Sequence, residues 1–164
     1  MQQLARMKDI HSAIEQLGVL AEIFEERRAS LARDAGVTVE QWRVLEEVAT
    51  ERFIPSMFAR SRASSQAAVS KIIRQLLDDN LIVVAIAKGD RRQRNYALTN
   101  RGRRVLDSVR EARQAAIDAI WRDLPASELS AFRNFARRLS ERIEAYARRE
   151  VGRTAPDVAP RIVY

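Results

Sequence analysis

Apolar residues recur every three or four positions along three long segments, the spacing that places them on one face of an α-helix. In residues 4–35 this apolar stripe consists of Ile10, Ile14, Leu17, Ala21, Phe24 and Leu31. In residues 99–122 it consists of Val105, Val109, Ala112, Ala116 and Ile120. In residues 127–149 it consists of Leu129, Phe132, Ala136, Leu139, Ile143 and Tyr146. The pattern predicts three long amphipathic helices, with Gly36 and Pro125 ending the first two.

Shorter elements lie between the first and second of these helices. Thr38 and Gln41 have the spacing of a capping box, which predicts a helix from there to about residue 51. Pro55 suits the first position of a short third helix, because its missing N–H has no partner there. Residues 62–65 then form a turn, with Ser64 or Ser65 as the cap of a fourth helix.

A β-hairpin is predicted after the fourth helix. Asn80 suits the left-handed residue that ends that helix. Residues 81–87 read LIVVAIA, a run rich in β-branched side chains, and residues 96–99 form the returning strand. Lys88 and Gly89 begin the turn, and the tip reads DRRQR. A helix, a turn, a second helix and a hairpin together predict a winged helix-turn-helix.

The predicted fold class is therefore mainly α with a small β wing. Residues 37–99 form the winged helix-turn-helix lobe, and residues 1–36 together with 100–150 form a helical dimerisation lobe. Residues 151–164 contain two prolines and no periodicity and are predicted to be a tail. The three long helices carry more apolar surface than so small a DNA-binding module can cover, so a second copy of the chain is the expected partner.

Positive charge is concentrated in the winged helix-turn-helix. Residues 60–104 contain eleven basic and three acidic side chains, a net charge of +8, whereas the whole chain carries +7. A positive field confined to one module is what neutralisation of DNA phosphates requires.

The fourth helix is the predicted recognition helix. Its apolar stripe, Ala68, Val69, Ile72, Ile73 and Leu76, is expected to face the core of the module. The opposite face and the cap are the candidate contacts with duplex DNA: Ser65, Gln66, Ala67, Ser70, Lys71 and Arg74. Glutamine and the basic side chains match adenine and guanine edges in the major groove. A solvated polar face without a partner fits the same pattern.

The tip of the hairpin is the second candidate DNA contact. Its residues are Lys88, Asp90, Arg91, Arg92 and Arg94. Three arginines in five positions are poor core material and suit a narrow, electronegative minor groove. Asp90 is close enough in sequence to Arg92 to hold its guanidinium in one geometry.

Composition excludes several other classes of protein. The chain has no Cys and one His, which argues against a thiol nucleophile, a structural metal centre or a His-based triad. No Gly-rich phosphate loop is present, so neither a cofactor nor an enzymatic activity is expected. No apolar run approaches the roughly 18 residues that a membrane span needs. A cytoplasmic protein without a membrane partner is predicted.

The chain resembles the MarR family of bacterial transcriptional regulators over residues 10–150. The likeness is closest at QWRVL (41–45), SQAAVSKIIRQLLDDNLI (65–82) and DRRQRNYALTNRG (90–102). The last segment is the most specific, with Asp90 and Arg92 followed at fixed intervals by Leu98, Thr99 and Gly102. By this resemblance Arg92 is the minor-groove arginine and Asp90 its brace. Asn80, Leu77 and Arg94 depart from the usual residues of the family at those positions.

The resemblance implies a homodimer on a pseudo-palindromic operator, usually a repressor released by a small aromatic acid or phenol. His11, Trp42 and Arg43 are the side chains that suit such an effector. Each also has an ordinary interpretation: His11 on a helix surface, Trp42 in the core, Arg43 paired with nearby glutamates. A different class also fits, a dimeric winged-helix adaptor that contacts proteins and binds no specific DNA.

Overall fold

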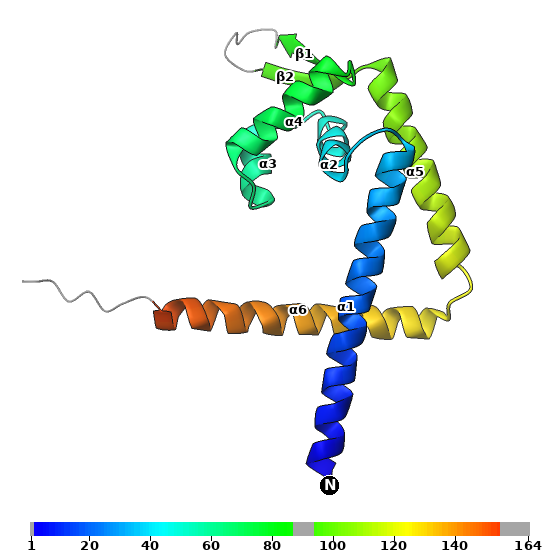
Figure 1. Ribbon diagram of the computed structural model, residues 1–164, viewed down its shortest axis with the longest axis vertical. Coiled ribbons are helices and arrows are strands. Elements are labelled where there is room, and N and C mark those ends of the chain that lie inside the picture. Colours follow the sequence, from blue (N-terminus) through cyan, green and yellow to red (C-terminus); the bar gives the residue numbers. More distant parts are fainter. Residues whose placement is uncertain (1, 87–93, 155–164) are drawn as a thin grey trace, which may run out of the picture. The chain divides into compact units, whose positions relative to one another are not determined.

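The computed structural model describes residues 2–86 and 94–154. In chain order, the elements there are α1 (Gln2–Asp34), α2 (Val39–Val48), α3 (Pro55–Ser61), α4 (Gln66–Asp78), β1 (Ile82–Ile86), β2 (Arg94–Leu98), α5 (Asn100–Trp121) and α6 (Ala126–Thr154). The chain divides into two compact units, residues 1–116 and residues 117–164. The predicted class, mainly α with a small β wing, is confirmed (Figure 1). No helix in the described part is long and apolar enough to cross a membrane.

The predicted helix starts are confirmed by their hydrogen bonds. At α2 the Gln41 N–H donates to Thr38 Oγ1 at 3.1 Å, and the Thr38 N–H donates to Gln41 Oε1 at 2.8 Å, which completes the capping box. Pro55 occupies the first turn of α3, and Ser65 rather than Ser64 caps α4. The N–H groups at a helix start have no partner within the helix. Thr38 and Ser65 each accept a hydrogen bond from one of them, and Pro55 has no N–H that needs a partner.

Helices α1, α3 and α4 each end two residues before a residue in the left-handed region. Gly36, after α1, has a φ of 74°, and Asn80, after α4, has a φ of 54°, as the sequence predicts. Ala63, after α3, has a φ of 49°, and the next N–H, that of Ser64, donates to the Ala59 carbonyl at 2.9 Å. This hydrogen bond closes the helix end and turns the chain toward α4. An alanine is an unfavourable residue for that conformation.

Three predicted boundaries were wrong. Helix α2 ends at Val48 instead of residue 51, and Glu51 itself lies outside the helix with a left-handed φ of 60°. Strand β2 begins at Arg94 instead of residue 96 and stops before Thr99, whose side chain caps α5 by accepting the Gly102 N–H at 2.9 Å. Helix α6 runs to Thr154, beyond the predicted end at residue 149, since the next proline in the sequence is Pro156.

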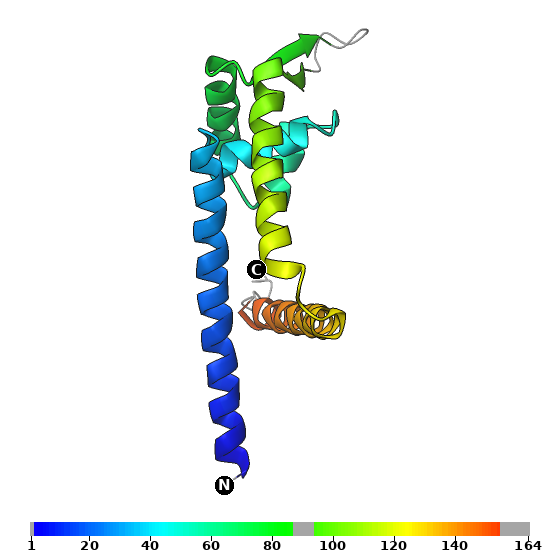
Figure 2. The same cartoon turned by 90° about the vertical axis from the view of Figure 1, so that its right-hand side faces the viewer.

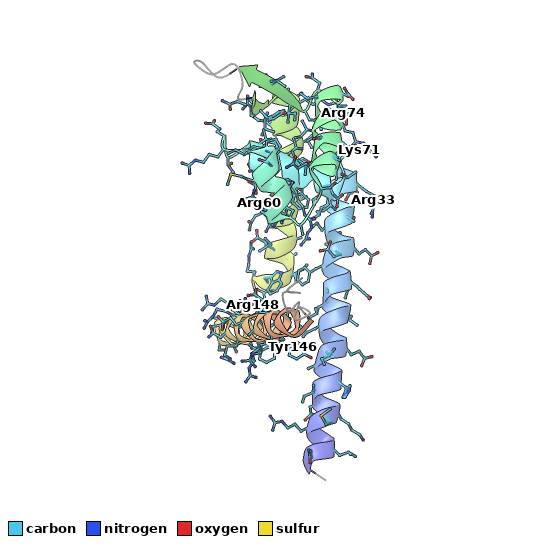
Figure 3. All side chains as sticks on the ribbon, turned by 90° about the vertical axis from the view of Figure 1, so that its left-hand side faces the viewer. Arg33, Arg60, Lys71, Arg74, Tyr146 and Arg148 are labelled. Carbon is cyan, nitrogen blue, oxygen red and sulfur yellow. The ribbon has the colours of Figure 1, made fainter. Side chains whose placement is uncertain are left out.

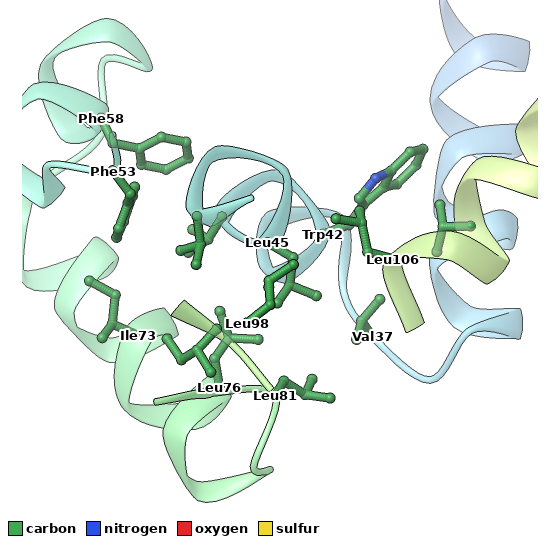
Figure 4. Packing of buried hydrophobic residues seen from close by; sticks show 14 of the residues in the cluster. Val37, Trp42, Leu45, Phe53, Phe58, Ile73, Leu76, Leu81, Leu98 and Leu106 are labelled. Carbon is green, nitrogen blue, oxygen red and sulfur yellow. The ribbon is translucent and has the colours of Figure 1, made fainter. Parts of the chain in front are cut away.

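One hydrophobic core joins the elements of the first unit, and Figure 4 shows its centre. Leu45 of α2 and Leu76 of α4 are fully buried, and Leu98 of β2 points toward both. Burial of each leucine contributes roughly 1.5–3 kcal/mol. Edge-to-face contacts of Phe53 with Phe58 and with Tyr96, both at 5.7 Å between ring centroids, extend the core toward α3 and the hairpin. The core holds α4 and the hairpin together as one lobe.

The hairpin is antiparallel and in a single register. Ile82 lies opposite Leu98, and Ile86 lies opposite Arg94. Both residues of the first pair are buried, so this end of the hairpin belongs to the core. The other end extends away from it, which is the arrangement of a wing.

Helix α1 contacts the lobe only through its carboxyl-terminal end. Leu31 and Ala32 are buried, whereas every residue from 3 to 27 is exposed. At 1.5 Å per residue its 33 residues span about 50 Å. Figures 1 and 2 show that end of α1 beside α2, with the rest of the helix extending away from the lobe.

Ala63→Gly is expected to raise the free energy of unfolding by about 0.5–1 kcal/mol. A left-handed φ costs a residue with a Cβ about 1–2 kcal/mol, and glycine removes that cost from the folded state. The greater freedom of glycine in the unfolded chain lowers stability by about 0.5–1 kcal/mol and so offsets part of this gain. Urea unfolding at one fixed protein concentration measures the change. The control, Ala115→Gly in the exposed middle of α5, should lower stability by about 1 kcal/mol. Equal losses in both variants would contradict the assigned conformation of Ala63.

Candidate nucleic-acid interface

Ser65 fixes where α4 begins. Its φ and ψ of −75° and 149° are extended, and its Oγ accepts the Ala68 N–H at 3.1 Å. Gln66 and Ala67 are therefore the first two residues of the helix and lie exposed at its amino-terminal end. In a helix-turn-helix this end of the second helix is the one that meets base edges.

The two faces of α4 differ sharply in burial. Val69, Ile73 and Leu76 are buried in the core. The six residues predicted to contact DNA are all exposed: Ser65, Gln66, Ala67, Ser70, Lys71 and Arg74. Ala68 was expected to face the core but is exposed, because it lies about 100° around the helix from Val69. Burial of one face thus presents the polar face to the outside.

Lys71 and Arg74 are one helical turn apart on the exposed face of α4 (Figure 3). No ion pair of either is present among the described residues. Asp78 lies on the same side at the carboxyl-terminal end, about two turns from Lys71. Positive charge therefore occupies the middle of the exposed face of α4 and negative charge its carboxyl-terminal end.

Two further arginines of the helix-turn-helix were absent from the predicted contacts. Arg60 and Arg62 are exposed at the end of α3 and in the turn before α4. The Arg62 guanidinium lies over the Phe58 ring, with 5.8 Å between its Cζ and the ring centroid. Such stacking restrains the side chain, and it leaves the planar edge of the guanidinium available to phosphate. The signal in the sequence was present, since both residues belong to the basic segment 60–104.

Most of the predicted wing contacts lie outside the described residues. These are Lys88, Asp90, Arg91 and Arg92. The backbone of Arg94 is described and begins β2. The strands that carry the tip are in place, and the roles of its side chains stay predictions.

The three predicted effector residues do not meet within one chain. His11 is exposed on α1, and its Nδ1 lies 2.7 Å from the Met7 carbonyl oxygen. It is about 30 Å along the helix from Leu31, where α1 contacts the lobe. Trp42 is a core residue, 6% exposed, and Arg43 is half-buried beside it in sequence.

Trp42 differs from the rest of the core in one polar atom. Its indole Nε1 is buried and has no hydrogen-bond partner among the described residues. A buried donor without a partner costs about 1–3 kcal/mol. Arg43 has no ion pair in the described part of the chain, where Glu46 lies 4.0 Å from Arg113 instead. The expected pairing of Arg43 with glutamates is thus not observed.

A shallow cavity of about 220 Å³ lies elsewhere in the first unit. It is lined by the end of α2, the end of β2 and α5, including Val48, Leu98, Arg103 and Leu106. None of the three predicted effector residues lines it. Its volume is below the roughly 300 Å³ of the smallest usual ligand pockets. Within residues 2–86 and 94–154 no group of three or more His, Asp or Glu side chains is placed to hold a metal ion.

The exposed face of α4, the turn before it and the hairpin after it define a winged helix-turn-helix lobe. The sequence model of the MarR family matches residues 35–93, which span the lobe from α2 to the wing. The resemblance to MarR family regulators is therefore confirmed over this lobe. No curated protein sequence matches the chain.

Solved structures extend the likeness in fold to most of the chain. A MarR family transcription regulator superposes with a TM-score of 0.78 and 17% identity, over 90% of this chain and 99% of that one. A mutant of MepR from S. aureus, bound to an oligodeoxyribonucleotide, superposes with a TM-score of 0.57 and 17% identity, over 79% of this chain and 96% of that one. Staphylococcus aureus MarR, in complex with salicylate and kanamycin, superposes with a TM-score of 0.63 and 16% identity, over 82% of this chain and 92% of that one. The chain has the fold of MarR family transcription regulators.

Proposed function

We propose that the chain is a sequence-specific DNA-binding transcriptional regulator of the MarR type, acting as a dimeric repressor that a small ligand releases from DNA. One observation carries the proposal. Helix α4 buries Val69, Ile73 and Leu76 and exposes its polar face within a segment of net charge +8. The family match over residues 35–93 and the DNA-bound MepR structure support the same function.

The side chains of α4 divide into two kinds of contact. Gln66 and Arg74 read base edges in the major groove, because a side-chain amide matches adenine and a guanidinium matches guanine. Lys71 and the stacked Arg62 bind phosphate and set the register of the helix on the duplex. The hydroxyl groups of Ser65 and Ser70 donate hydrogen bonds to phosphates of the DNA backbone.

The wing supplies the second contact with the same half-site. Arg92, with Lys88, Arg91 and Arg94, enters the adjacent minor groove, where narrow width strengthens the negative potential. Asp90 holds the Arg92 guanidinium in position. Ile82 and Leu98 anchor the base of the hairpin in the same core that the buried face of α4 enters.

A second copy of the chain covers the apolar faces of the long helices. On α1, Ile10 and Ile14 are 43% and 61% exposed, and on α6, Ile143 is 60% exposed. Apolar stripes that span many turns are expected at interfaces between chains. A two-fold dimer presents two copies of α4, so the operator is a pseudo-palindrome.

The ligand that releases the repressor is an aromatic acid or phenol with an oxygen acceptor for Trp42 Nε1. That indole donor is buried and lacks a partner in the described part of the chain. Salicylate, an aromatic acid, is bound in the MarR structure from Staphylococcus aureus. Binding there would act at α2, where Trp42 lies near Leu106 of α5 (Figure 4).

Selection of bound duplexes from a random pool tests the DNA-binding function. The parent is expected to enrich a pseudo-palindrome, with an affinity that falls steeply as salt rises. Enrichment of no sequence, with binding to bulk polyanion alone, would overturn the proposal in favour of the adaptor.

Lys71→Ala, Arg74→Ala and Arg92→Ala are each expected to weaken operator binding by about 1–3 kcal/mol. Arg74→Ala should also relax the preference at one base pair, and Lys71→Ala should lower the salt slope by about one. Fluorescence anisotropy over a salt series measures both effects. The control, Arg138→Ala on the side of α6 opposite its apolar stripe, should bind like the parent. Parent-like binding by both α4 variants would mean that the recognition face is misassigned.

Ile143→Glu is expected to weaken the dimer by at least about 100-fold, because a two-fold interface contains the substitution twice and each buried isoleucine is worth about 1.5–3 kcal/mol. Sedimentation equilibrium over a range of concentrations measures the dissociation constant. Arg138→Glu adds a carboxylate to the opposite side of α6 and should leave the dimer intact. If both variants dimerise like the parent, the stripe of α6 is not the interface.

Trp42→Phe is expected to raise the ligand concentration needed for release from DNA by about tenfold or more. The substitution removes the indole N–H and keeps an aromatic ring in the core, and one hydrogen bond to a charged acceptor is worth about 1.5–3 kcal/mol. Titration with a panel of aromatic carboxylates and phenols, with operator release as the signal, measures this. The stability of the variant should change little, since a buried donor without a partner disappears with the indole. A response equal to that of the parent would exclude Trp42 as the ligand's donor.

A further inference from the structure

The end of α4 and the start of α5 meet in a direct contact between backbone atoms. A Cβ built on Gly102, in the first turn of α5, would lie 1.9 Å from the Leu81 carbonyl oxygen and 2.9 Å from its carbonyl carbon. Both are backbone atoms, which have no rotamer to change. Only glycine permits this approach, since real Cβ atoms essentially never come within 3.0 Å of such neighbours.

Thr99 ties the same two helix ends together with its hydroxyl and its N–H. Thr99 Oγ1 donates to the Asn80 carbonyl at 2.7 Å, with the Leu81 carbonyl oxygen at 3.2 Å. The same oxygen accepts the Gly102 N–H at 2.9 Å, and the Thr99 N–H donates to the Leu81 carbonyl at 3.1 Å. One residue therefore caps α5 and holds the carboxyl-terminal end of α4.

The α4 side of this junction is itself closed. Asn80 has a left-handed φ of 54°, and the Leu81 N–H donates to the Leu76 carbonyl at 2.9 Å. Leu76 and Leu81 are both buried. The position of the Leu81 carbonyl therefore follows the direction of α4, and a displacement of that carbonyl would tilt the helix.

Apart from this junction, the backbone of α5 makes few close approaches to the winged helix-turn-helix lobe. None of the closely packed element pairs in the described part of the chain includes α5. Its buried side chains there are Leu106 and Val109, and side chains adjust more readily than a backbone contact does. The junction of Gly102 and Thr99 with residues 80–81 is thus the most restrictive link between α4 and α5.

We propose that Gly102 and Thr99 are positioning residues that set the orientation of the recognition helix, and so its ability to discriminate between DNA sequences. This inference rests on the proposed DNA-binding function. Hydrogen bonds to base edges require side chains placed within about 0.5 Å and 10–20°, whereas attraction to phosphates tolerates larger shifts. A displaced junction therefore removes sequence preference before it removes binding to DNA.

Gly102→Ala tests the inference, with Gly18→Ala as the matched control because nothing lies within 4 Å of a Cβ at Gly18. The measured quantity is the ratio of affinities for the selected operator and an unrelated duplex, at one salt concentration and well below the unfolding temperature. Gly102→Ala should lower this ratio at least about tenfold while affinity for the unrelated duplex stays within about twofold. Gly18→Ala should keep the ratio of the parent. An unchanged ratio in Gly102→Ala overturns the inference.

A second pair of variants covers the case in which Gly102→Ala fails to fold. Thr99→Val keeps the shape of the side chain and loses the hydroxyl that bonds Asn80 and Gly102. Thr99→Ser keeps that hydroxyl. The valine variant is expected to lose sequence discrimination and the serine variant to retain it. Equal ratios in the two variants overturn the inference.

A distance measurement separates this inference from the proposed function. The chain has no Cys, so spin labels attach only at introduced positions. Gln75→Cys on α4 and Ser108→Cys on α5 are both exposed sites. With labelled chains diluted in excess unlabelled protein, pulsed EPR should give one narrow distance distribution for the parent and a shifted or broadened one for Gly102→Ala. An unchanged distribution overturns the inference even if DNA binding is established. Absence of duplex preference in the parent contradicts the proposed function alone.

Discussion

Burial of one side of α4 is the constraint on which the rest of the lobe depends. Val69, Ile73 and Leu76 enter a core shared with α2, α3 and the hairpin, and a helix that buries one side must expose the other. The side that remains carries Gln66, Lys71 and Arg74. The side chains that the proposed function places on DNA are therefore presented by core packing alone.

The two ends of α4 are fixed by different means. At the amino-terminal end, the Ser65 hydroxyl accepts one helix N–H, which fixes the first residue of the helix. At the carboxyl-terminal end, Asn80 turns the chain and the Leu81 carbonyl rests on Gly102. A side-chain cap tolerates small changes of angle, whereas contact between backbone atoms does not. The more rigid end is the one joined to α5.

Net positive charge and exposed apolar surface lie in different parts of the chain. Residues 60–104 hold a net charge of +8, and the long apolar stripes lie on α1 and α6, outside that segment. The proposed contacts with phosphate and with a second chain therefore involve different residues, so substitutions can change each of them independently. Trp42 belongs to neither region, because it lies in the core with one buried donor left without a partner.

Local chemistry determined much of this protein from the sequence alone. The capping box of Thr38 and Gln41, the proline of α3 and the left-handed Gly36 and Asn80 depend on neighbouring residues only, and so does the helical period of α4. Long-range packing decided what the sequence did not reveal. Ala63 takes a left-handed φ because the turn to α4 requires it, although no local preference of alanine favours that conformation.

A continuous α1 places His11 about 30 Å along the helix from Leu31, where α1 contacts the lobe that contains Trp42, and the packing of that lobe brought Gly102 against Leu81. The contact of Gly102 with Leu81 was not readable in the sequence, since contacts between residues far apart in the chain depend on how the helices pack.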